Sequence, residues 1–270
     1  MVDRMLTRAP LVLLLLLACV KTTPTLPACE GELLFGAPNS KTGLDSTSCG
    51  RGACTCGGKT FEPKTWSLTD LKALRAFRLT KAFDEVTSDP YANPPAAPNV
   101  PADAVCGVVN EGNGAYHLAD FDSVEAAFKA GAEPTHLGRC GVCSTLTDLA
   151  VYAGKPDLTA PVRDCGLNSL GAPMEQHVQC LRDLGFTLPC AQIWYWNTLH
   201  TRDACSSLCF AAIDAPYNEP DGGLNPCLQC DEDHSGVVFK AVAGRTRRNT
   251  GVPSSMCRPC SETRPFTHEY

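Results

Sequence analysis

The sequence predicts a mostly helical α+β domain with one small β-hairpin, stapled together by disulfides. Three observations support this prediction: 17 cysteines among 270 residues, an apolar content of 44%, and several helix-capping motifs followed by apolar residues at helical spacing. Only 19% of the residues are charged, which is the composition of a folded domain and not of a disordered chain. A cysteine density this high is typical of proteins in an oxidising compartment.

The charge balance excludes one class of partner. Lys and Arg number 23 against 29 Asp and Glu, so the formal net charge is −6. Proteins that bind nucleic acid normally carry an excess of basic residues, because contacts to phosphate supply much of the affinity. We therefore expect no nucleic-acid partner.

Residues 1–18 are predicted to be a signal peptide. Arg4 and Arg8 precede an apolar run that is too short to span a bilayer, which takes roughly 20 apolar residues. The run ends in Leu16-Leu17-Ala18-Cys19, which resembles the lipobox of bacterial lipoproteins and so implies acylation of Cys19. The alternative is an ordinary secretory signal cleaved nearby. We expect an exported protein, either a periplasmic or cell-surface lipoprotein or a secreted protein, with membrane contact only through a lipid on Cys19.

The rest of the chain divides by composition. Residues 19–28 form a short tether, and residues 29–87 are rich in Cys and Gly with one helix that begins at Ser67. Five prolines make residues 88–103 an extended linker. The main disulfide-rich helical domain spans residues 104–270.

Within the main domain, the hairpin is expected over residues 105–121, where two apolar runs flank a segment rich in Asn and Gly. Capping motifs and stop signals place helices at about 122–131, 145–154, 173–184 and 189–212. We do not expect a buried strand at residues 134–139, just before Cys140.

The last helix is expected to start at Pro226, with Asn225 as its N-cap, and to continue towards Gly244. The apolar run at residues 237–242 favours a continuous helix through Ser235 and Gly236. At 1.5 Å per residue, such a helix separates Asp231 from Arg245 by roughly 20 Å, too far for one small ligand to touch both.

Cys140 and Cys143 form a Cys-x-x-Cys motif just ahead of a predicted helix. A thiol at a helix N-terminus has a lowered pKa, which favours the reactive thiolate, so this pair is the candidate catalytic site of a thiol–disulfide oxidoreductase. Combined with Cys227 and Cys230, the motif is also a possible four-thiolate zinc site. The third interpretation is that each cysteine staples two helices.

Cys205 and Cys209 lie four residues apart on one predicted helix. That spacing suits bridges to a neighbouring helix better than a bridge between the two cysteines themselves.

Two charged clusters are candidate ligand sites. Asp231, Glu232 and His234 offer carboxylates and an imidazole, the donor types of a divalent-metal site, so a divalent metal is the one cofactor considered. Arg245, Arg247 and Arg248, with Asn249, offer donors suited to an anionic ligand. The alternative is structural, because acids early in a helix and bases near its end complement the helix dipole.

Trp194 and Trp196 form a further candidate. Two positions apart on a helix, their side chains face different ways, so one indole belongs to the core and the other, taken as Trp196, is a candidate to line a ligand groove.

Two motif pairs carry a resemblance to a known family. They are Cys140-Gly141-Val142-Cys143-Ser144 followed by Asp148-Leu149-Ala150-Val151-Tyr152, and Asn225-Pro226-Cys227-Leu228-Gln229-Cys230-Asp231-Glu232 followed by Ala243-Gly244-Arg245-Thr246-Arg247-Arg248. This pattern resembles a family of secreted cysteine-rich proteins from algae and other protists that has no assigned activity. The resemblance implies a secreted, disulfide-bonded domain and carries over no catalytic residues.

The function that the sequence favours is a binding module for a small anionic or metal-associated ligand, or for a cell-surface component. The alternatives are thiol–disulfide exchange at Cys140 and Cys143, and a structural surface protein without a ligand.

The export prediction can be tested by the intact mass of the native protein before and after alkylation. Without Cys19, 16 of the 17 cysteines remain, an even number that can close eight disulfides. We expect no alkylation without reductant, and added acyl mass on Cys19. Several readily alkylated thiols would contradict the disulfide prediction, and an unmodified Cys19 would contradict lipidation.

Overall fold

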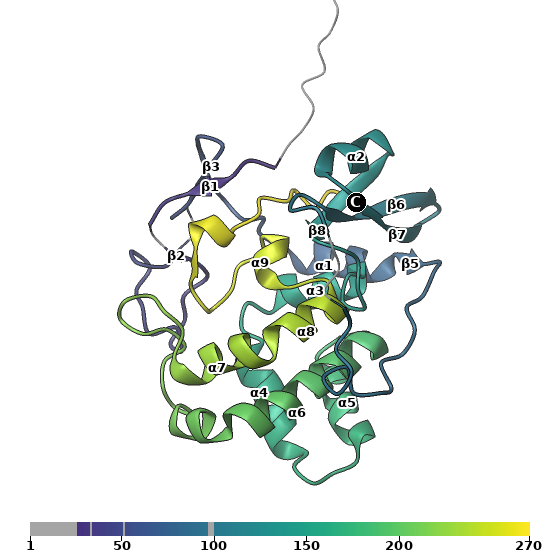
Figure 1. Cartoon of the computed structure of the whole chain (residues 1–270). Coiled ribbons are helices and arrows are strands. Elements are labelled where there is room, and N and C mark those ends of the chain that lie inside the picture. Colours follow the sequence, from purple (N-terminus) through teal and green to yellow (C-terminus); the bar gives the residue numbers. More distant parts are fainter. Residues whose placement is uncertain (1–25, 33, 51, 97–99) are drawn as a thin grey trace, which may run out of the picture.

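The computed structural model describes residues 26–32, 34–50, 52–96 and 100–270 (Figure 1). Its described part is a helical body joined to a small β-sheet, and 16 cysteines pair in eight disulfides. The predicted fold class, a disulfide-stapled α+β domain, is confirmed. The predicted signal peptide and Cys19 lie outside the described residues. No helix in the described ranges has the length and apolar character needed to cross a membrane.

The body is built around α3 (Leu146–Gly154), which is buried along most of its length. Thr145 caps it by accepting a hydrogen bond from the Asp148 backbone N–H, as the sequence predicts. Two more predicted helices are present as α5 (Met174–Asp183) and α6 (Leu188–Ala211).

α4 (Thr159–Asn168) is a helix that was not predicted from the sequence. Its N-cap, Leu158, makes no side-chain capping bond, and Pro161 lies in its first turn, where the missing N–H is tolerated. Gly166 lets α4 cross α6 closely, since a Cβ there would lie 2.8 Å from Cγ2 of Thr198. The Asp157 carboxylate, one residue before Leu158, accepts hydrogen bonds from the backbone N–H groups of Thr159 and Ala160 at 3.0 and 3.3 Å. Tertiary packing and the Cys165–Cys180 disulfide hold the rest of the helix.

The predicted last helix is divided, which corrects the expectation of continuity. α7 (Pro226–His234) begins at the Asn225 cap as expected, but it ends at Ser235, where α8 (Gly236–Ala243) begins. The Ser235 hydroxyl is buried and hydrogen-bonded to Nδ1 of His200 at 3.0 Å and to the Thr201 hydroxyl at 2.9 Å. These bonds to α6 fix the junction between the two helices. A short helix, α9 (Arg247–Thr250), follows.

The sheet has the strand order β5-β7-β6-β8. β6 (Val105–Gly112) and β7 (Ala115–Phe121) form the predicted hairpin, turning at Asn113 and Gly114 with φ of 50° and 69°. β5 (Arg78–Leu79) pairs with β7 in parallel. α2 (Val124–Lys129), predicted at about 122–131, contacts the sheet, and Ser123 is its N-cap.

β8 (Ala132–Leu137) shows that the expectation of no buried strand at residues 134–139 was wrong. Proline is unfavourable in a strand because it lacks an N–H. Here Pro134 lies on the edge strand β8, opposite an irregularity in the strand pairing between Cys106 and Gly107. The missing N–H therefore does not remove a hydrogen bond between central strands.

The N-terminal region is attached to the end of the chain. β1 (Cys29–Glu30), β3 (Thr55–Cys56) and β4 (Lys59–Thr60) form one small sheet, and β2 (Leu34–Phe35) pairs with β9 (Arg258–Pro259). The Cys49–Cys257 and Cys54–Cys260 disulfides, the second at η1 (Cys260–Glu262), join the same two regions. Figure 1 shows the purple N-terminal strands beside the yellow C-terminal segment. The predicted helix at Ser67 is α1 (Leu68–Ala76).

The Cys165–Cys180 disulfide, which joins α4 to α5 across 15 residues, provides a stability test. We expect the double variant Cys165→Ala/Cys180→Ala to lose about 3 kcal/mol of unfolding free energy by the chain-entropy estimate, measured by urea unfolding at pH 7. Titration for free thiols verifies that the other bridges remain closed. An unchanged urea midpoint would contradict a stabilising role for this bridge.

Candidate functional site

The cysteines of the candidate redox and zinc sites are all in disulfides with other partners. Cys140 bonds Cys106 of β6, and Cys143 bonds Cys190 of α6, so the two cysteines of the motif do not pair with each other. Cys230 and Cys227 bond Cys205 and Cys209, as the spacing on α6 predicted. The disulfides therefore act as staples between the sheet and the helices and between α6 and α7.

Arg245 is a fully buried structural residue. Its guanidinium donates to the backbone carbonyls of Cys143 at 3.1 Å, Ser144 at 2.9 Å and Thr135 at 3.2 Å, and to the hydroxyls of Thr135 at 2.8 Å and Thr250 at 3.3 Å. All its donors face neutral oxygens inside the fold. Burial lowers the pKa of Arg245, the expected direction for a cation removed from water.

Asn249 and Trp196 are also held by the fold. The Asn249 amide completes a capping box with Thr246 and donates to the carbonyls of Leu137 and Gly244 at 2.8 and 2.7 Å. Trp196 donates its indole N–H to the carbonyl of Val86 at 2.8 Å. Both side chains anchor neighbouring segments.

Arg248 belongs to a cluster of ion pairs, which we call the Glu232 cluster. Glu232 pairs with Arg248, with Arg258 at 3.3 Å and with Lys240 at 3.2 Å, and Arg248 also contacts Glu262 at 3.1 Å. Burial by itself raises the pKa of Glu232, but Arg258, Arg248 and Lys240 outweigh that effect and lower the pKa to about 2. The break at Ser235 thus brings the Glu232 carboxylate together with the guanidiniums of Arg248 and Arg258. The arginine of the 245–248 segment that meets a carboxylate is therefore Arg248 and not Arg245.

Asp231 lies in a different network. Its Oδ1 accepts hydrogen bonds from the Thr201 hydroxyl and from the Asn197 amide, the latter at 3.1 Å. Tyr91, from the predicted linker, donates to Oδ1 of Asn197 at 2.8 Å and stacks on His200 with ring centroids 4.2 Å apart. Burial is the main cause that raises the pKa of Asp231.

The three residues considered for a metal have separate surroundings. Asp231 is in the network above, Glu232 is in its ion-pair cluster, and His234 is exposed. Across the described residues, no group of three or more His, Cys, Asp or Glu side chains is arranged to hold a metal ion.

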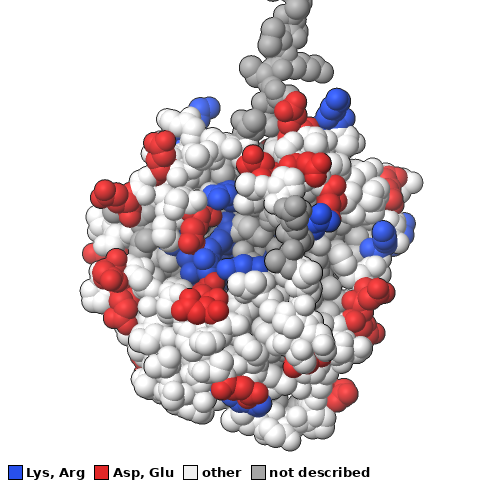
Figure 2. Space-filling model, viewed as in Figure 1, with Lys and Arg blue, Asp and Glu red and all other residues white. Residues whose placement is uncertain are grey.

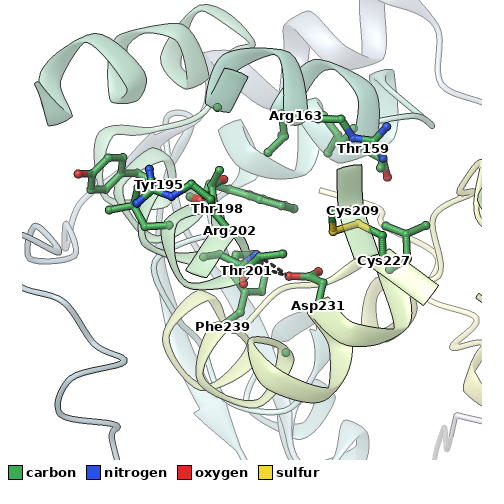
Figure 3. Close-up of a pocket in the computed structure, with 18 of the residues that line it drawn as sticks. Thr159, Arg163, Tyr195, Thr198, Thr201, Arg202, Cys209, Cys227, Asp231 and Phe239 are labelled. Atoms are coloured by element: carbon green, nitrogen blue, oxygen red, sulfur yellow. Dashed lines mark hydrogen bonds between the residues drawn. A yellow bond between two sulfur atoms is a disulfide. The ribbon is translucent and has the colours of Figure 1, made fainter. Parts of the chain in front are cut away.

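A cavity of about 520 Å³ lies between α4, α6, α7 and α8. Figure 3 looks into it, with Thr159 and Arg163 of α4 on one side and Asp231 of α7 and Phe239 of α8 on the other. Its surface is mostly apolar, with Leu158, Val162, Leu199 and Phe239 among the contributing side chains. Protein sites for small organic molecules commonly have volumes of about 300–1,000 Å³ and an apolar lining with a few polar groups.

Buried polar atoms in this cavity lack hydrogen bonds. Among the described side chains that line it, Nε2 of His177, Nε1 of Trp194 and the hydroxyl of Tyr152 have no partner of normal geometry. Tyr152 and Trp194 are close enough to interact, but without such a bond. An unsatisfied buried polar atom costs about 1–3 kcal/mol, so these three groups are available to hydrogen-bond whatever occupies the cavity.

Burial determines the charge state of these groups. It lowers the pKa of His177, with a smaller contribution from Arg202, so the imidazole is neutral at pH 7. It also raises the pKa of Tyr152, which keeps the phenol protonated. The cavity therefore offers neutral hydrogen-bonding groups next to its apolar wall.

The charges around the cavity are mainly positive, although the chain as a whole is acidic. Among the described residues, those that line it include six cations against two acids: Arg163, Arg202, Lys240, Arg247, Arg248 and Arg258 against Asp231 and Glu232. Figure 2 shows Lys and Arg atoms in a hollow near the middle of the visible face, in the region of α7 and α9, with Asp and Glu atoms beside it.

Arg247, one of the lining cations, is held by backbone carbonyls. Its guanidinium donates to the carbonyls of Tyr152 at 2.7 Å, Pro253 at 2.9 Å and Lys155, and lies 5.5 Å from the centroid of the Tyr152 ring. Within the described ranges no salt bridge joins it to a carboxylate, although Asp157 acts on its pKa through charge. Burial lowers that pKa to about 10, which leaves Arg247 charged at neutral pH.

Arg247, Arg248, Asp231 and Glu232, which the sequence predicts as site residues, all line the cavity, but the sequence indicates neither the cavity nor Tyr152 and His177. Tyr152 and His177 each occur on a predicted helix, and nothing in their local sequence separates them from core residues. In addition, α4 forms one wall of the cavity and was not predicted, so the cavity could not be inferred from the predicted elements.

The comparisons with known proteins give one match. Residues 174–265 match the family of unknown function DUF8771, and this segment runs from α5 to beyond η1, about a third of the chain. No curated protein and no solved structure matches. The matched residues contain the α6, α7 and α8 walls of the cavity but not α4 or Tyr152. Over this segment the chain is thus similar to a cysteine-rich family without a known function.

Glu232 provides a pH test of the ion-pair cluster. Its carboxylate stabilises the fold fully above pH 4.5, its ordinary pKa, and this stabilisation is lost as the pH falls towards about 2. We expect Glu232→Gln to lower the unfolding free energy by on the order of 3 kcal/mol at pH 7, with the difference from the native protein shrinking towards pH 2.

The measurement is urea unfolding at several pH values. Asp233→Asn is the matched control on the same helix, because Asp233 is exposed and, among the described residues, bonds only the Gln229 side chain. A difference for Glu232→Gln that stays constant from pH 7 to pH 2 would show that the ion pairs are not its source.

Proposed function

We propose that this protein is a binding module and that its ligand is a small organic anion held in the cavity between α4, α6, α7 and α8. The observation that carries the proposal is the set of unpartnered buried polar atoms on Tyr152, His177 and Trp194, all lining one mostly apolar cavity. Polar groups on the wall of an apolar cavity are the usual means by which a protein orients a small ligand.

The negative charge of the ligand follows from the end of the cavity at Tyr152. The Trp194 indole offers an N–H donor and Tyr152 a hydroxyl, while the charge of Arg247 lies beside the Tyr152 ring without a salt-bridged carboxylate. A carboxylate, sulfonate or phosphate of the ligand would accept hydrogen bonds there and balance that charge.

Disulfide pairing favours binding over thiol–disulfide exchange. An exchange site at Cys140 and Cys143 needs a dithiol that closes on itself, whereas each cysteine here bridges to a different element. Cys143 and both bridge partners are fully buried, which removes them from attack by another thiol.

We infer that binding takes place outside the cell. Eight disulfides are stable in an oxidising compartment, which agrees with the predicted signal peptide. In this proposal the Leu-Leu-Ala-Cys sequence attaches the protein to a membrane through Cys19 if it is a lipobox, and the protein is released if it is a secretory signal.

The proposal is tested with anilinonaphthalene sulfonate, an aromatic anion whose fluorescence reports binding. We expect stoichiometric binding to the native oxidised protein, and at least a tenfold loss of affinity in Arg247→Gln. Arg264→Gln is the matched control, because Arg264 also donates to backbone carbonyls, those of Ser261 and Thr263, but does not line the cavity. Equal affinity in both variants would contradict the proposal.

Tyr152→Phe provides a second variant that does not depend on Arg247. Removing a buried hydroxyl without a hydrogen bond of normal geometry should raise the melting temperature of the unliganded protein. It should also weaken probe binding severalfold, since the ligand loses a partner. Lower stability together with unchanged binding would show that the hydroxyl has a structural role.

A further inference from the structure

Two large apolar side chains at the end of α4 are exposed at the edge of the same cavity. Leu167, in the last turn of α4, and Leu170, just beyond it, are 37% and 56% exposed. Both line the cavity, and we call this pair the apolar rim. Phe210 and Ile213 also line the cavity, but Arg163 donates to the carbonyl of Ile213 at 3.0 Å, which places them beside the middle of α4 and not at its end.

The apolar rim and the Arg247 end lie at opposite ends of α4. The Arg247 guanidinium binds the carbonyl of Lys155, four residues before α4 begins at Thr159. Leu167 is eight residues beyond Thr159, which corresponds to about 12 Å along the helix axis. The cavity therefore has a cationic, hydrogen-bonding end and an apolar end along one axis.

We propose that the ligand is a single-chain amphiphile, with an anionic head group at Arg247 and Tyr152 and an aliphatic tail that runs along α4 to the apolar rim. This proposal rests on the proposed function and specifies its ligand class. The positive charge at one end and the apolar side chains at the other fit such a molecule, whereas a compact anion would leave the rim uncovered.

The interior between the two ends suits a tail. Leu158 and Val162 of the α4 wall are almost fully buried and face a cavity that continues past Phe239 of α8. Covering these walls and the rim removes apolar surface from water, so the affinity should increase with the length of the tail until the chain passes the rim.

The test is a displacement titration of anilinonaphthalene sulfonate by butanoate, octanoate, dodecanoate and hexadecanoate, each below its critical micelle concentration. We expect the affinity to rise roughly fourfold for each methylene that becomes buried, and then to level off. Dodecanol is the neutral comparison, and it should bind more weakly than dodecanoate to the native protein but equally to Arg247→Gln.

Rim variants separate the tail from the head group. In Leu167→Ser and Leu170→Ser the affinity for hexadecanoate should fall several-fold or more, while the affinity for butanoate stays unchanged. Leu208→Ser is the matched control, because Leu208 is also exposed, at 43%, but does not line the cavity.

The outcomes distinguish the two proposals. Anion binding that depends on Arg247 but not on chain length would overturn the amphiphile proposal and leave the proposed function intact. No binding of any anion would overturn both. A chain-length effect that the rim variants leave unchanged would show that the tail does not follow α4, and would also overturn the inference.

Discussion

The buried guanidinium of Arg245 is the constraint on which the rest of the structure depends. It ties together β8 through Thr135, the entry to α3 through Cys143 and Ser144, and α9 through Thr250. A buried cation is costly unless every donor is satisfied, so these segments have to keep their positions together. Displacement of any one of them would leave charge and hydrogen-bond donors without partners.

The same junction explains the Cys-x-x-Cys motif. Val142 and Cys143 donate backbone hydrogen bonds to the carbonyls of Val242 and Ala243 at the end of α8. A Cβ on Gly141 would lie 2.3 Å from the carbonyl oxygen of Val242, so only glycine allows this approach. The two disulfides of the motif then connect the junction to β6 and to α6, which makes the motif a structural joint between the sheet and the helical body.

From this joint, the chain reaches the cavity within two residues. Because Arg245 is fixed, the backbone of α9 is fixed, and Arg247 meets the carbonyls at the end of α3 and just beyond it, beside the Tyr152 ring. The cavity thus has a rigid polar end built on the core. Its other wall, α4, is capped by the Asp157 carboxylate and held by the Cys165–Cys180 disulfide and by the close crossing at Gly166. The cavity is therefore bounded by elements that are each fixed by contacts distant in sequence.

The sequence by itself determined the local features: the disulfide-stapled α+β class, the hairpin, the helices with strong caps such as Thr145 and Asn225, and the bridges from Cys205 and Cys209 to a neighbouring helix. These follow from side-chain spacing and capping, which act over a few residues. Only the tertiary structure decided the break at Ser235, the helix α4, the strand at Pro134 and the cavity. Each depends on a partner distant in sequence: hydroxyl bonds to α6, packing on Thr198, an outer position in the sheet, and walls from separate helices. Such contacts are fixed by the packing of the whole chain, and no local pattern records them.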